Sequence, residues 1–592
     1  MSLEGVWGSI FSFERGRFLW KWPERIPYPI TVSFGAPMPH TATPVQVRQA
    51  VQEMQSDAWI HRKRRMKTIG TAFLHTARRH PRRFAMADGQ AGAVKYGAAL
   101  ARAVFLARRL KPVWAGQEKV GILLPPSVPG ALVNLAAFLS GRVPVNLNYT
   151  ASDEVLASCA KQCGIKTVVT ARAFLEKVKL TVPGETLFIE DLAAKPGGGE
   201  KLSAFLLSRF APSRWLQRTL GEGRVPGIDD LATLIFSSGS TGDPKGVMLS
   251  HYNIGSNVDQ IGQTFQLDPS DRILGILPFF HSFGFTATLA MPAMLGAGVV
   301  YHVSPLDSRA IGALARQHEA TFLLATPTFL QAYMRRVDPA DFGSLKFVMA
   351  GAEKLPDRIA TAFEERFGIR PLEGYGCSEC SPVVTVNTRD FRAAGFRQVG
   401  AKRGKIGHPL PGMSVRVVDP DTFEPKPLGE PGLLLVKGPN VMQGYLGQPE
   451  KTAAVLKDGW YTTGDMAAVD ADGFVQITDR LSRFSKIGGE MVPHVKVEDL
   501  LQELSGETDR VFAVTGVPDE KKGERLVVLH TLKDDAVKAC LEKLGHADLP
   551  NLWVPRPNQF FHVETIPHLG TGKLDLRKVR EVAVQRSGGE AA

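Results

Sequence analysis

The chain has 592 residues, more than one hydrophobic core usually supports, so we expect about two to four domains. Hydrophobic residues make up 44% and charged residues 22%, which excludes a disordered chain, and five cysteines exclude a disulfide framework. The formal net charge of +12 predicts an acidic partner and leaves nucleic acid, anionic lipid, nucleotide and acidic carrier protein open. No apolar run reaches the roughly eighteen residues that cross a bilayer, and Glu and Arg interrupt the N-terminal apolar stretches, unlike a signal peptide. We therefore expect a cytoplasmic protein.

Residues 1–60 differ from the rest of the chain in their sequence pattern. Residues 26–39 predict a short β segment that ends in a Pro-rich turn. The next stretch predicts a helix with Thr43 as its N-cap and Pro44 in its first position. The Arg/Lys run at 62–67 has the composition of a linker.

From Tyr96 onward, helix and strand patterns alternate. Apolar residues recur at helical spacing in 98–110 and again in 130–141. The first of these stretches is followed by a strand-like apolar run at 120–126 and the second by one at 143–147. Further strand-like runs occur at 167–171, 186–190, 231–237, 272–278, 297–301, 321–327 and 345–351. This alternation predicts an α/β fold of stacked, mostly parallel sheets with helices between them.

The sequence pattern changes again near residue 400, where short strand-like runs are separated by Gly/Pro turns. We expect a large α/β domain at 61–479, whose small β-rich subdomain covers about 400–479. A small, mobile α+β domain is expected at 480–592.

One stretch, 200–224, interrupts the alternation. It sets an apolar face against a basic one, and Pro212 must kink or split its helix. The residues that form these faces are Leu202, Phe205, Leu206, Arg209, Phe210, Trp215 and Leu216. Two interpretations stay open: a segment that lies on an anionic membrane surface, and an insert that packs on the domain core.

A loop within 234–250 is rich in small hydroxyl residues and glycine and closes on Lys245. Glycines let backbone N–H groups turn toward an anion, hydroxyls donate hydrogen bonds, and the lysine adds positive charge. The loop is no P-loop, because Pro244 stands at the second glycine position and Gly246 at the Ser/Thr position. It predicts phosphate binding through Ser237, Ser238, Gly239, Ser240, Thr241, Gly242 and Lys245.

Further short motifs follow this loop along the chain. They are PFFHSFG (278–284), GAEKL (351–355), YGCSE (375–379), GWYTTGD (459–465), DRLSRFSKIGGE (479–490) and GTGK (570–573). In this order and spacing they resemble the adenylate-forming family of acyl- and aryl-CoA synthetases, peptide-synthetase adenylation domains and luciferases, over roughly residues 65–585. The resemblance implies an AMP-forming acid–thiol ligase. Such an enzyme uses ATP and Mg²⁺ to convert a carboxylic acid into an acyl-adenylate, releases pyrophosphate, and then transfers the acyl group to a thiol.

The resemblance also implies roles for single residues. The adenine would lie along Gly351, Ala352 and Glu353 and stack on Tyr375, and the ribose would bind Asp465. Other implied ATP contacts are Gly376, Cys377, Ser378, Ile477 and Arg480, the last on the ribose or a phosphate.

The implied catalytic set is Lys573, His281, Glu379 and Thr241. Lys573 would bridge the carboxylate and the α-phosphate, and His281 would lie at the carboxylate end of the acyl pocket. Thr241 and Glu379 would hold Mg²⁺, a cation that prefers oxygen ligands.

The C-terminal domain of this family rotates between the two half-reactions. The resemblance places the hinge at Arg483, a position that is more often Asp or Lys in the family. The thiol tunnel would then involve Lys486, Gly488, Gly489 and Glu490.

The sequence around three of these motifs is closer to one subgroup of the family than to generic CoA ligases. The strings YGCSECSPVVTVN, GKIGHPLPGM and RFSKIGGEMV resemble the synthetase half of bifunctional 2-acylglycerophosphoethanolamine acyltransferase/acyl-acyl-carrier-protein synthetases. Residues 6–39 resemble the tail of a PlsC-type acyltransferase, but the N-terminal region has no H-x₄-D motif. We therefore expect 1–60 to be a remnant of that domain and a linker.

A fatty acid is the favoured substrate, because the segments expected to border the pocket are apolar and contain no acidic residue. The subgroup favours acyl carrier protein as the thiol acceptor, and a long-chain fatty acid–CoA ligase is the alternative. A non-catalytic acyl- and nucleotide-binding membrane scaffold is a third hypothesis. Nothing resembles a nucleic-acid module, so nucleic acid is not expected as a partner. Peripheral contact with the inner face of the cell membrane stays open beside the cytoplasmic localisation.

Overall fold

The computed structural model describes residues 1–4, 30–194, 197–237, 244–480, 483–487, 490–507, 509–519, 523–544, 549–550, 553–568 and 574–588. Of residues 480, 486, 490 and 491 only the backbone is described.

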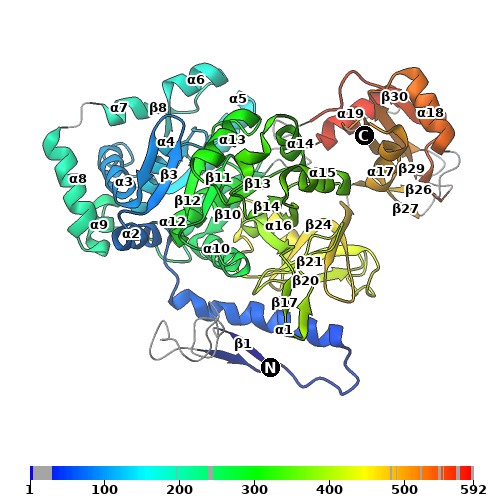
Figure 1. Cartoon of the computed structure of the whole chain (residues 1–592), viewed down its shortest axis with the longest axis horizontal. Helices are drawn as coiled ribbons and strands as arrows, with labels where there is room; N and C mark the ends of the chain where they lie inside the picture. The colour runs from blue at the N-terminus through cyan, green and yellow to red at the C-terminus, as the bar shows by residue number, and fades with distance from the viewer. Residues whose placement is uncertain are drawn as a thin grey trace.

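Among the described residues, the largest sheet has nine strands and a parallel centre (Figure 1). Its order is β19 (His408–Pro409), β16 (Val383–Val386), β15 (Leu372–Gly376), β14 (Phe347–Ala350), β13 (Phe322–Ala325), β11 (Arg272–Gly275), β12 (Gly298–Tyr301), β3 (Phe84–Asp88) and β4 (Gly92–Lys95). All neighbours from β15 to β3 are parallel, and antiparallel pairs stand at both edges. The central strands are continuous apolar runs because helices cover both faces of such a sheet.

A second sheet is entirely parallel and contains β6 (Val143–Asn146), β5 (Lys119–Ile122), β7 (Thr167–Thr170) and β8 (Glu185–Phe188). Beside it lies an antiparallel sheet of β22 (Gly444–Tyr445), β10 (Lys245–Ser250) and β9 (Leu231–Ser237). The two sheets meet where Thr233 Oγ1 donates to the carbonyl oxygen of Pro144 at 2.7 Å.

Helices fill the space between and around these sheets. The longer ones are α2 (Ile69–Arg79), α3 (Tyr96–Leu110), α4 (Val128–Leu139), α5 (Asp153–Cys163), α10 (His251–Phe265), α13 (Ser308–Gln317), α14 (Pro327–Arg336) and α15 (Asp357–Phe367). The shorter ones are α6 (Arg172–Val178), α7 (Ile189–Ala193), α11 (Ser282–Gly284), α12 (Met291–Leu295), α16 (Pro449–Val455), η2 (Phe285–Ala290), η3 (Pro339–Phe342) and η4 (Ser378–Cys380). Every residue of α4 except Pro129 is buried, as expected for a helix that is apolar on all sides.

The β-rich part is an antiparallel sheet of β20 (Ser414–Val418), β21 (Gly432–Lys437), β24 (Trp460–Val469), β23 (Leu456–Lys457) and β25 (Val475–Arg480). The hairpin of β17 (Phe391–Ala393) and β18 (Phe396–Gln398) lies outside this sheet. Short strands between Gly/Pro turns thus form β structure in this region, as predicted.

The C-terminal sheet contains β27 (Glu490–Pro493), β26 (Phe484–Ile487), β29 (Gly523–His530), β28 (Phe512–Asp519) and β30 (Phe560–His562). Its helices are α17 (His494–Ser505), α18 (Asp534–Leu544) and α19 (Leu576–Ser587). Figure 1 shows these elements at the upper right, beside α14 and α15. The alternating large domain, the β-rich sheet and the C-terminal α+β unit together confirm the predicted fold class.

Helix α1 (Pro44–Ala58) begins where the sequence predicted, because Thr43 forms a capping box with Gln46. The helix packs along β20, where Glu53 pairs with Arg416 at 2.6 Å. Strands β1 (Ser2–Glu4) and β2 (Thr31–Ser33) pair beside it.

The Arg/Lys run after α1 is docked on the rest of the molecule. It begins in η1 (Trp59–Arg64), and Arg62 forms ion pairs with Glu4 at 2.8 Å and Asp259 at 2.6 Å. Its partners lie far away in the sequence, so composition alone could not identify this docked segment. Among the described residues, no helix combines the length and the apolar composition needed to cross a bilayer.

Candidate active site

Three of the predicted motifs follow the carboxyl ends of parallel strands in one sheet. The segment with His281 follows β11, the segment with Gly351 follows β14, and Cys377 follows β15. In parallel α/β sheets ligands bind at this edge, because the loops that leave it converge there. The strand order therefore gathers segments that are far apart in the sequence.

These segments approach one another closely. The hydroxyl of Ser282 lies 3.2 Å from that of Ser378, and a side chain at Gly351 would begin 3.4 Å from the ring of Phe283. His281 is half-buried, and the centroid of its ring lies 4.6 Å from the centroid of the Phe280 ring.

Two glycines are required by close backbone approaches in these turns. A Cβ at Gly284 would lie 2.1 Å from the carbonyl oxygen of Pro278, and one at Gly376 would lie 2.2 Å from that of Pro382. Real Cβ atoms do not approach oxygen so closely, so the turns that carry His281 and Cys377 need glycine at these positions.

Asp465 and Tyr375 form the polar centre of the site. Asp465, on β24, is only 5% exposed, and the hydroxyl of Tyr375 donates to its Oδ2. Burial, and then the Asp465 carboxylate, raise the pKa of Tyr375 well above its usual range, so the phenol remains a donor. A carboxylate accepts several hydrogen bonds, so Asp465 keeps capacity for ribose hydroxyls.

Residues of β25 flank this pair. The backbone of Arg480 is paired with that of Asp465, and the side chain of Arg480 lies outside the described residues. Ile477 is half-buried and packs against the core.

A second polar cluster contains Glu379, Tyr445 and Lys245. Tyr445 Oη donates to Glu379 Oε1 at 3.0 Å, and Lys245 Nζ lies 5.1 Å from the centroid of the Tyr445 ring. The pairing of β22 with β10 places Tyr445 opposite Val247, just beyond the predicted phosphate loop. Sequence reasoning missed Tyr445, because its role depends on this pairing of distant strands.

Glu379 fits the role of a protein ligand to Mg²⁺. Its hydrogen bond to Tyr445 leaves carboxylate lone pairs for a hard cation, which protein sites commonly hold through one or two carboxylates and substrate phosphates. Within the described ranges, no group of three or more His, Cys, Asp and Glu could hold a metal ion.

The GAEKL loop is strained and connects to two other elements. Ala352 has a φ of 70°, in the left-handed region that disfavours residues with a Cβ, and such strain often occurs at functional sites. Glu353 Oε2 accepts from Thr328 Oγ1 at 3.0 Å. Leu355 N–H donates to Glu373 Oε1 at 3.0 Å, which ties the loop to β15.

The cysteine in YGCSE contacts a second cysteine. Its contact with Cys380, followed by burial, raises the pKa of Cys377 well above its usual range. The group therefore stays a neutral thiol, and both cysteines are free of disulfides.

Arg483 is anchored in the C-terminal unit. The residue is 8% exposed, and its guanidinium pairs with Glu498 of α17, whose Oε1 also accepts from Val514 N–H at 2.7 Å. The predicted hinge role of Arg483 stays a prediction.

Several predicted site residues lie outside the described part of the chain. These are Ser238, Gly239, Ser240, Thr241, Gly242, Gly488, Gly489 and Lys573, together with the side chains of Lys486 and Glu490. The flanks of the phosphate loop are described, and Ser237 and Lys245 are paired across β9 and β10.

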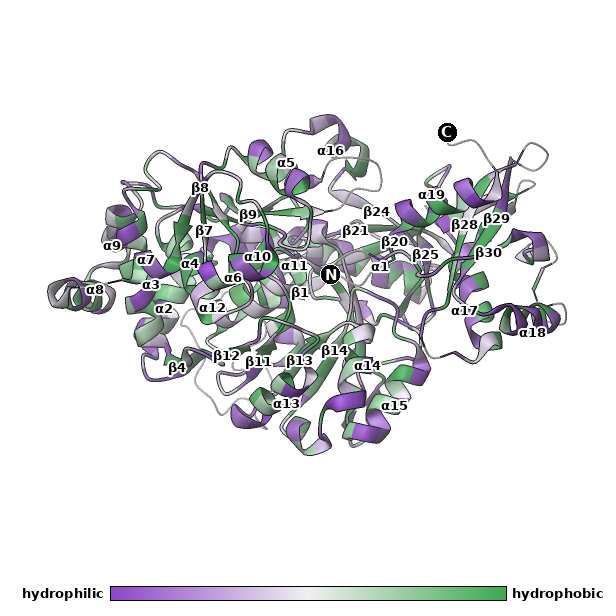
Figure 2. Ribbon diagram, turned by 90° about the horizontal axis from the view of Figure 1, so that it is seen from above, coloured by the Kyte–Doolittle hydropathy of each residue, from purple (hydrophilic) through white to green (hydrophobic). Residues whose placement is uncertain are grey.

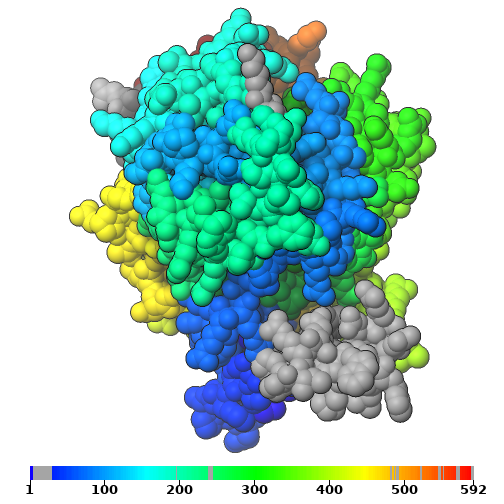
Figure 3. All heavy atoms as spheres, turned by 90° about the vertical axis from the view of Figure 1, so that its left-hand side faces the viewer, coloured from blue at the N-terminus to red at the C-terminus, as the bar shows by residue number. Residues whose placement is uncertain are grey.

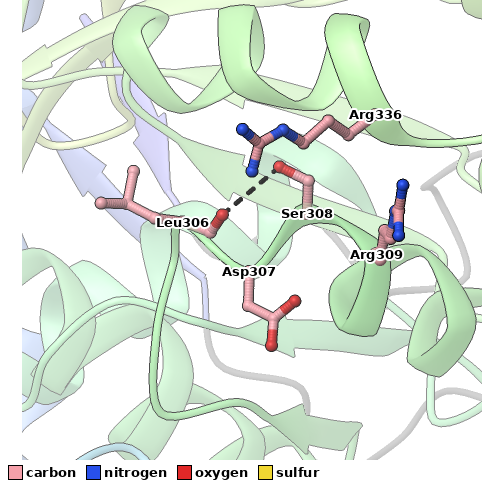
Figure 4. Close-up of a pocket in the computed structure, with 5 residues that line it drawn as sticks. All are labelled: Leu306, Asp307, Ser308, Arg309 and Arg336. Atoms are coloured by element: carbon pink, nitrogen blue, oxygen red, sulfur yellow. Dashed lines mark hydrogen bonds between the residues drawn. The ribbon is translucent and has the colours of Figure 1, made fainter.

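A shallow cavity of about 370 Å³ lies at the start of α13 (Figure 4). It is lined by Leu306, Asp307, Ser308, Arg309 and Arg336, and Ser308 Oγ donates to the carbonyl oxygen of Leu306. It contains none of the predicted site residues.

The model of the family described as AMP-binding enzyme matches residues 73–446. The chain belongs to this family. It is 35% identical to a feruloyl-CoA synthase of Amycolatopsis sp over 362 residues, which cover 60% of this chain and 70% of that protein. It is 34% identical to a long-chain-fatty-acid–CoA ligase of Bacillus subtilis (strain 168) over 369 residues, 60% of this chain and 63% of that protein. The fold matches ATP-bound MatB from Rhodopseudomonas palustris with a TM-score of 0.72 and 26% identity, over 88% of this chain and 99% of that chain.

Family membership makes this chain an ATP-dependent ligase that forms an acyl-adenylate, of the acid–thiol class. ATP is the nucleotide of such enzymes, and MenE from Bacillus subtilis, which shares the fold at 22% identity, is described in complex with ATP and a magnesium ion. The predicted enzyme class and cofactors are confirmed, whereas the roles of the individual site residues stay predictions.

Proposed function

We propose that this enzyme activates a long-chain fatty acid with ATP and transfers the acyl group to the thiol of CoA. The observation that carries the proposal is the convergence of the His281, Gly351 and Cys377 segments at one sheet edge, with Asp465 hydrogen-bonded to Tyr375 beside them. Such a site can hold a nucleotide next to a carboxylate.

The first half-reaction joins two anions. A carboxylate oxygen bonds to the α-phosphorus of ATP, the bond from that phosphorus to the bridging oxygen breaks, and pyrophosphate leaves with its electrons. Catalysis then depends on positioning and on positive charge where negative charge gathers. In this proposal Lys573 and Mg²⁺ supply that charge, Thr241 and Glu379 hold the metal, and Asp465 holds the ribose.

The choice of a fatty acid rests on the chain after His281. Residues 282–295 contain no charged side chain, and η2 is buried throughout. A polar amino acid would need an acidic partner for its ammonium group, and this stretch contains none. The Bacillus relative is named for a long-chain fatty acid, which also supports this choice.

The choice of CoA replaces the expectation of a carrier protein. The two curated relatives described above are named as CoA enzymes, and the net charge of +12 suits anionic CoA as well as an acidic carrier protein. The subgroup resemblance keeps acyl carrier protein as the second acceptor to test. That residues 1–60 derive from an acyltransferase stays a prediction that rests on their sequence.

We also propose that the C-terminal unit rotates about Arg483 between the two half-reactions. Its described polar contacts with the large domain include exposed pairs, Lys354 with Asp499 at 2.5 Å and Arg335 with Asp509 at 3.1 Å. Solvent-exposed ion pairs add little stability, so contacts of this kind can be exchanged at small cost.

The test offers the purified enzyme ATP and Mg²⁺ with palmitate or ferulate, and with CoA or holo-carrier protein as acceptor. We expect palmitoyl-CoA and AMP. A thioester on the carrier protein alone would replace CoA as acceptor, and preferred feruloyl-CoA formation would refute the fatty acid. Absence of AMP with every acid would refute the function as a whole. Asp465→Asn serves as the control for contaminating ligases, because its product should fall at limiting ATP.

A further inference from the structure

The segment at 198–220 forms two helices at the end of the molecule opposite the C-terminal unit (Figures 1 and 2). They are α8 (Gly198–Phe210) and α9 (Ser213–Leu220), separated at Ala211 and Pro212. Pro212 thus splits the helix, as the sequence predicted.

The inner side of the pair is held firmly. Ala204 and Ser208 of α8 are buried where the helix packs on α3. Arg78 Nε donates to the carbonyl oxygen of Ser208 at 2.8 Å, and Arg109 pairs with Glu200 at 2.5 Å. The segment is therefore packed on the domain, and its conformation does not depend on a membrane.

The outer side carries the large apolar side chains. At about 100° per residue, Leu202, Phe205, Leu206 and Phe210 fall on one face of α8, opposite Ala204 and Ser208. Together with Trp215 of α9 they are between 44% and 72% exposed. A surface helix normally turns such a face toward the core, and a contiguous exposed apolar patch marks an interaction site.

The patch surrounds the break between the helices. An apolar hollow of about 500 Å³ lies there, lined by Leu206, Leu207, Phe210, Ala211, Pro212 and Trp215. Figure 3 shows the teal surface of α8 and α9 turned outward on this side of the molecule.

Positive charge accompanies the apolar patch. Lys201, Arg209, Arg214 and Arg218 are exposed, and within the described part of the chain none of them pairs with a carboxylate. The acidic residues of the stretch are already engaged, since Glu200 pairs with Arg109 and Glu222 pairs with Arg142. The surface therefore combines exposed aromatic and aliphatic groups with unneutralised cations.

We propose that α8 and α9 dock the enzyme on the surface of an anionic lipid bilayer. The apolar side chains enter the boundary between headgroups and acyl chains, and the cations contact lipid phosphates. A second copy of the chain is a poorer occupant, because a two-fold contact would bring the same cations together. This docking does not depend on which thiol accepts the acyl group.

The test measures binding of the full chain to vesicles. Vesicles of phosphatidylcholine with about 30 mol% phosphatidylglycerol are compared with phosphatidylcholine alone, and we expect binding at least about tenfold stronger to the anionic vesicles. The variant Phe210→Ser/Trp215→Ser should weaken binding at least about tenfold, since both side chains enter the lipid. The variant Arg209→Gln/Arg214→Gln/Arg218→Gln should weaken binding and reduce its dependence on salt.

A matched control is available on the β17–β18 hairpin. Phe391 and Phe396 are 58% and 56% exposed and lie beside Arg392 and Arg397, so Phe391→Ser/Phe396→Ser removes comparable apolar surface elsewhere. We expect this control to bind vesicles like the wild type. Unchanged thermal unfolding of all variants would confirm that the changes affect only the surface.

Three results would overturn the proposal. They are a wild type that does not bind anionic vesicles, equal binding by the Phe210→Ser/Trp215→Ser variant, and an equal loss in the hairpin control. If light scattering shows a wild-type dimer that the same variant dissociates, the occupant is a second copy and the lipid assignment fails.

Discussion

Glu373 should make the stability of the large domain depend on pH. It lies on β15 with 8% of its surface exposed, and its Oε1 accepts the Leu355 N–H at 3.0 Å. Burial raises the pKa of Glu373 from 4.5 to about 7, although the Leu355 N–H and the charge of Lys354 act to lower it.

The direction in which the free energy of unfolding changes with pH follows from proton uptake. Between pH 4.5 and about 7 the folded protein keeps the proton that the unfolded chain has released, so the free energy of unfolding falls as pH rises. The stabilisation is fully present below pH 4.5 and is lost as pH rises through about 7. The difference between the two pKa values corresponds to about 3 kcal/mol.

The assay is urea unfolding of the wild type and Glu373→Gln at about pH 5 and about pH 8. Gln keeps an acceptor for the Leu355 N–H but cannot ionise. We expect the wild type to lose about 2.5 kcal/mol relative to the variant between these pH values, because part of the effect already occurs below pH 5. Glu365 is an exposed carboxylate on α15, so the unfolding free energy of Glu365→Gln should match that of the wild type at both pH values. Equal pH dependence in the wild type and Glu373→Gln would refute the reasoning.

Further substitutions test the site. Asp465→Asn should raise the KM for ATP by about 10- to 100-fold, because hydrogen bonds to a charged group contribute about 1.5–3 kcal/mol, and a KM within about twofold of wild type would contradict the ribose assignment. Gly284→Ala places a Cβ 2.1 Å from the Pro278 carbonyl oxygen and should lower the unfolding free energy by about 1–3 kcal/mol. Gly89→Ala, with nothing within 4 Å, is its control in thermal unfolding, and an equal effect would contradict the steric argument. Lys573→Ala should abolish pyrophosphate exchange and leave ATP affinity nearly intact, whereas exchange at the wild-type rate would remove Lys573 from catalysis.

Local features were predictable because their causes are local. The Thr43 cap depends on residues within one turn, and the helix break at Pro212 follows from a missing N–H. The motif order was enough to predict the family, which the match over residues 73–446 confirms.

Other expectations could not be settled from the sequence because they depend on distant partners. Composition suggested a linker at 62–67, but Arg62 meets Glu4 and Asp259. Periodicity suggested an apolar face opposite a basic one at 200–224, but the face of α8 that packs on the domain carries Ala204 and Ser208, and Arg209 is exposed on the same side as the large apolar residues. The subgroup resemblance favoured a carrier protein, whereas the named relatives favour CoA.

The sequence by itself determined the alternation of strands and helices, the caps and breaks of single helices, and the ordered motifs, since each depends on spacing along the chain. Only the tertiary structure decided which of these residues meet. Tyr375 and Asp465 are ninety positions apart, and Tyr445 reaches Glu379 because β22 pairs with β10. The large apolar side chains of α8 point outward because Ala204 and Ser208 allow the helix to pack closely on α3. Strand order and packing bring these groups together, and neither is encoded in the period of any one segment.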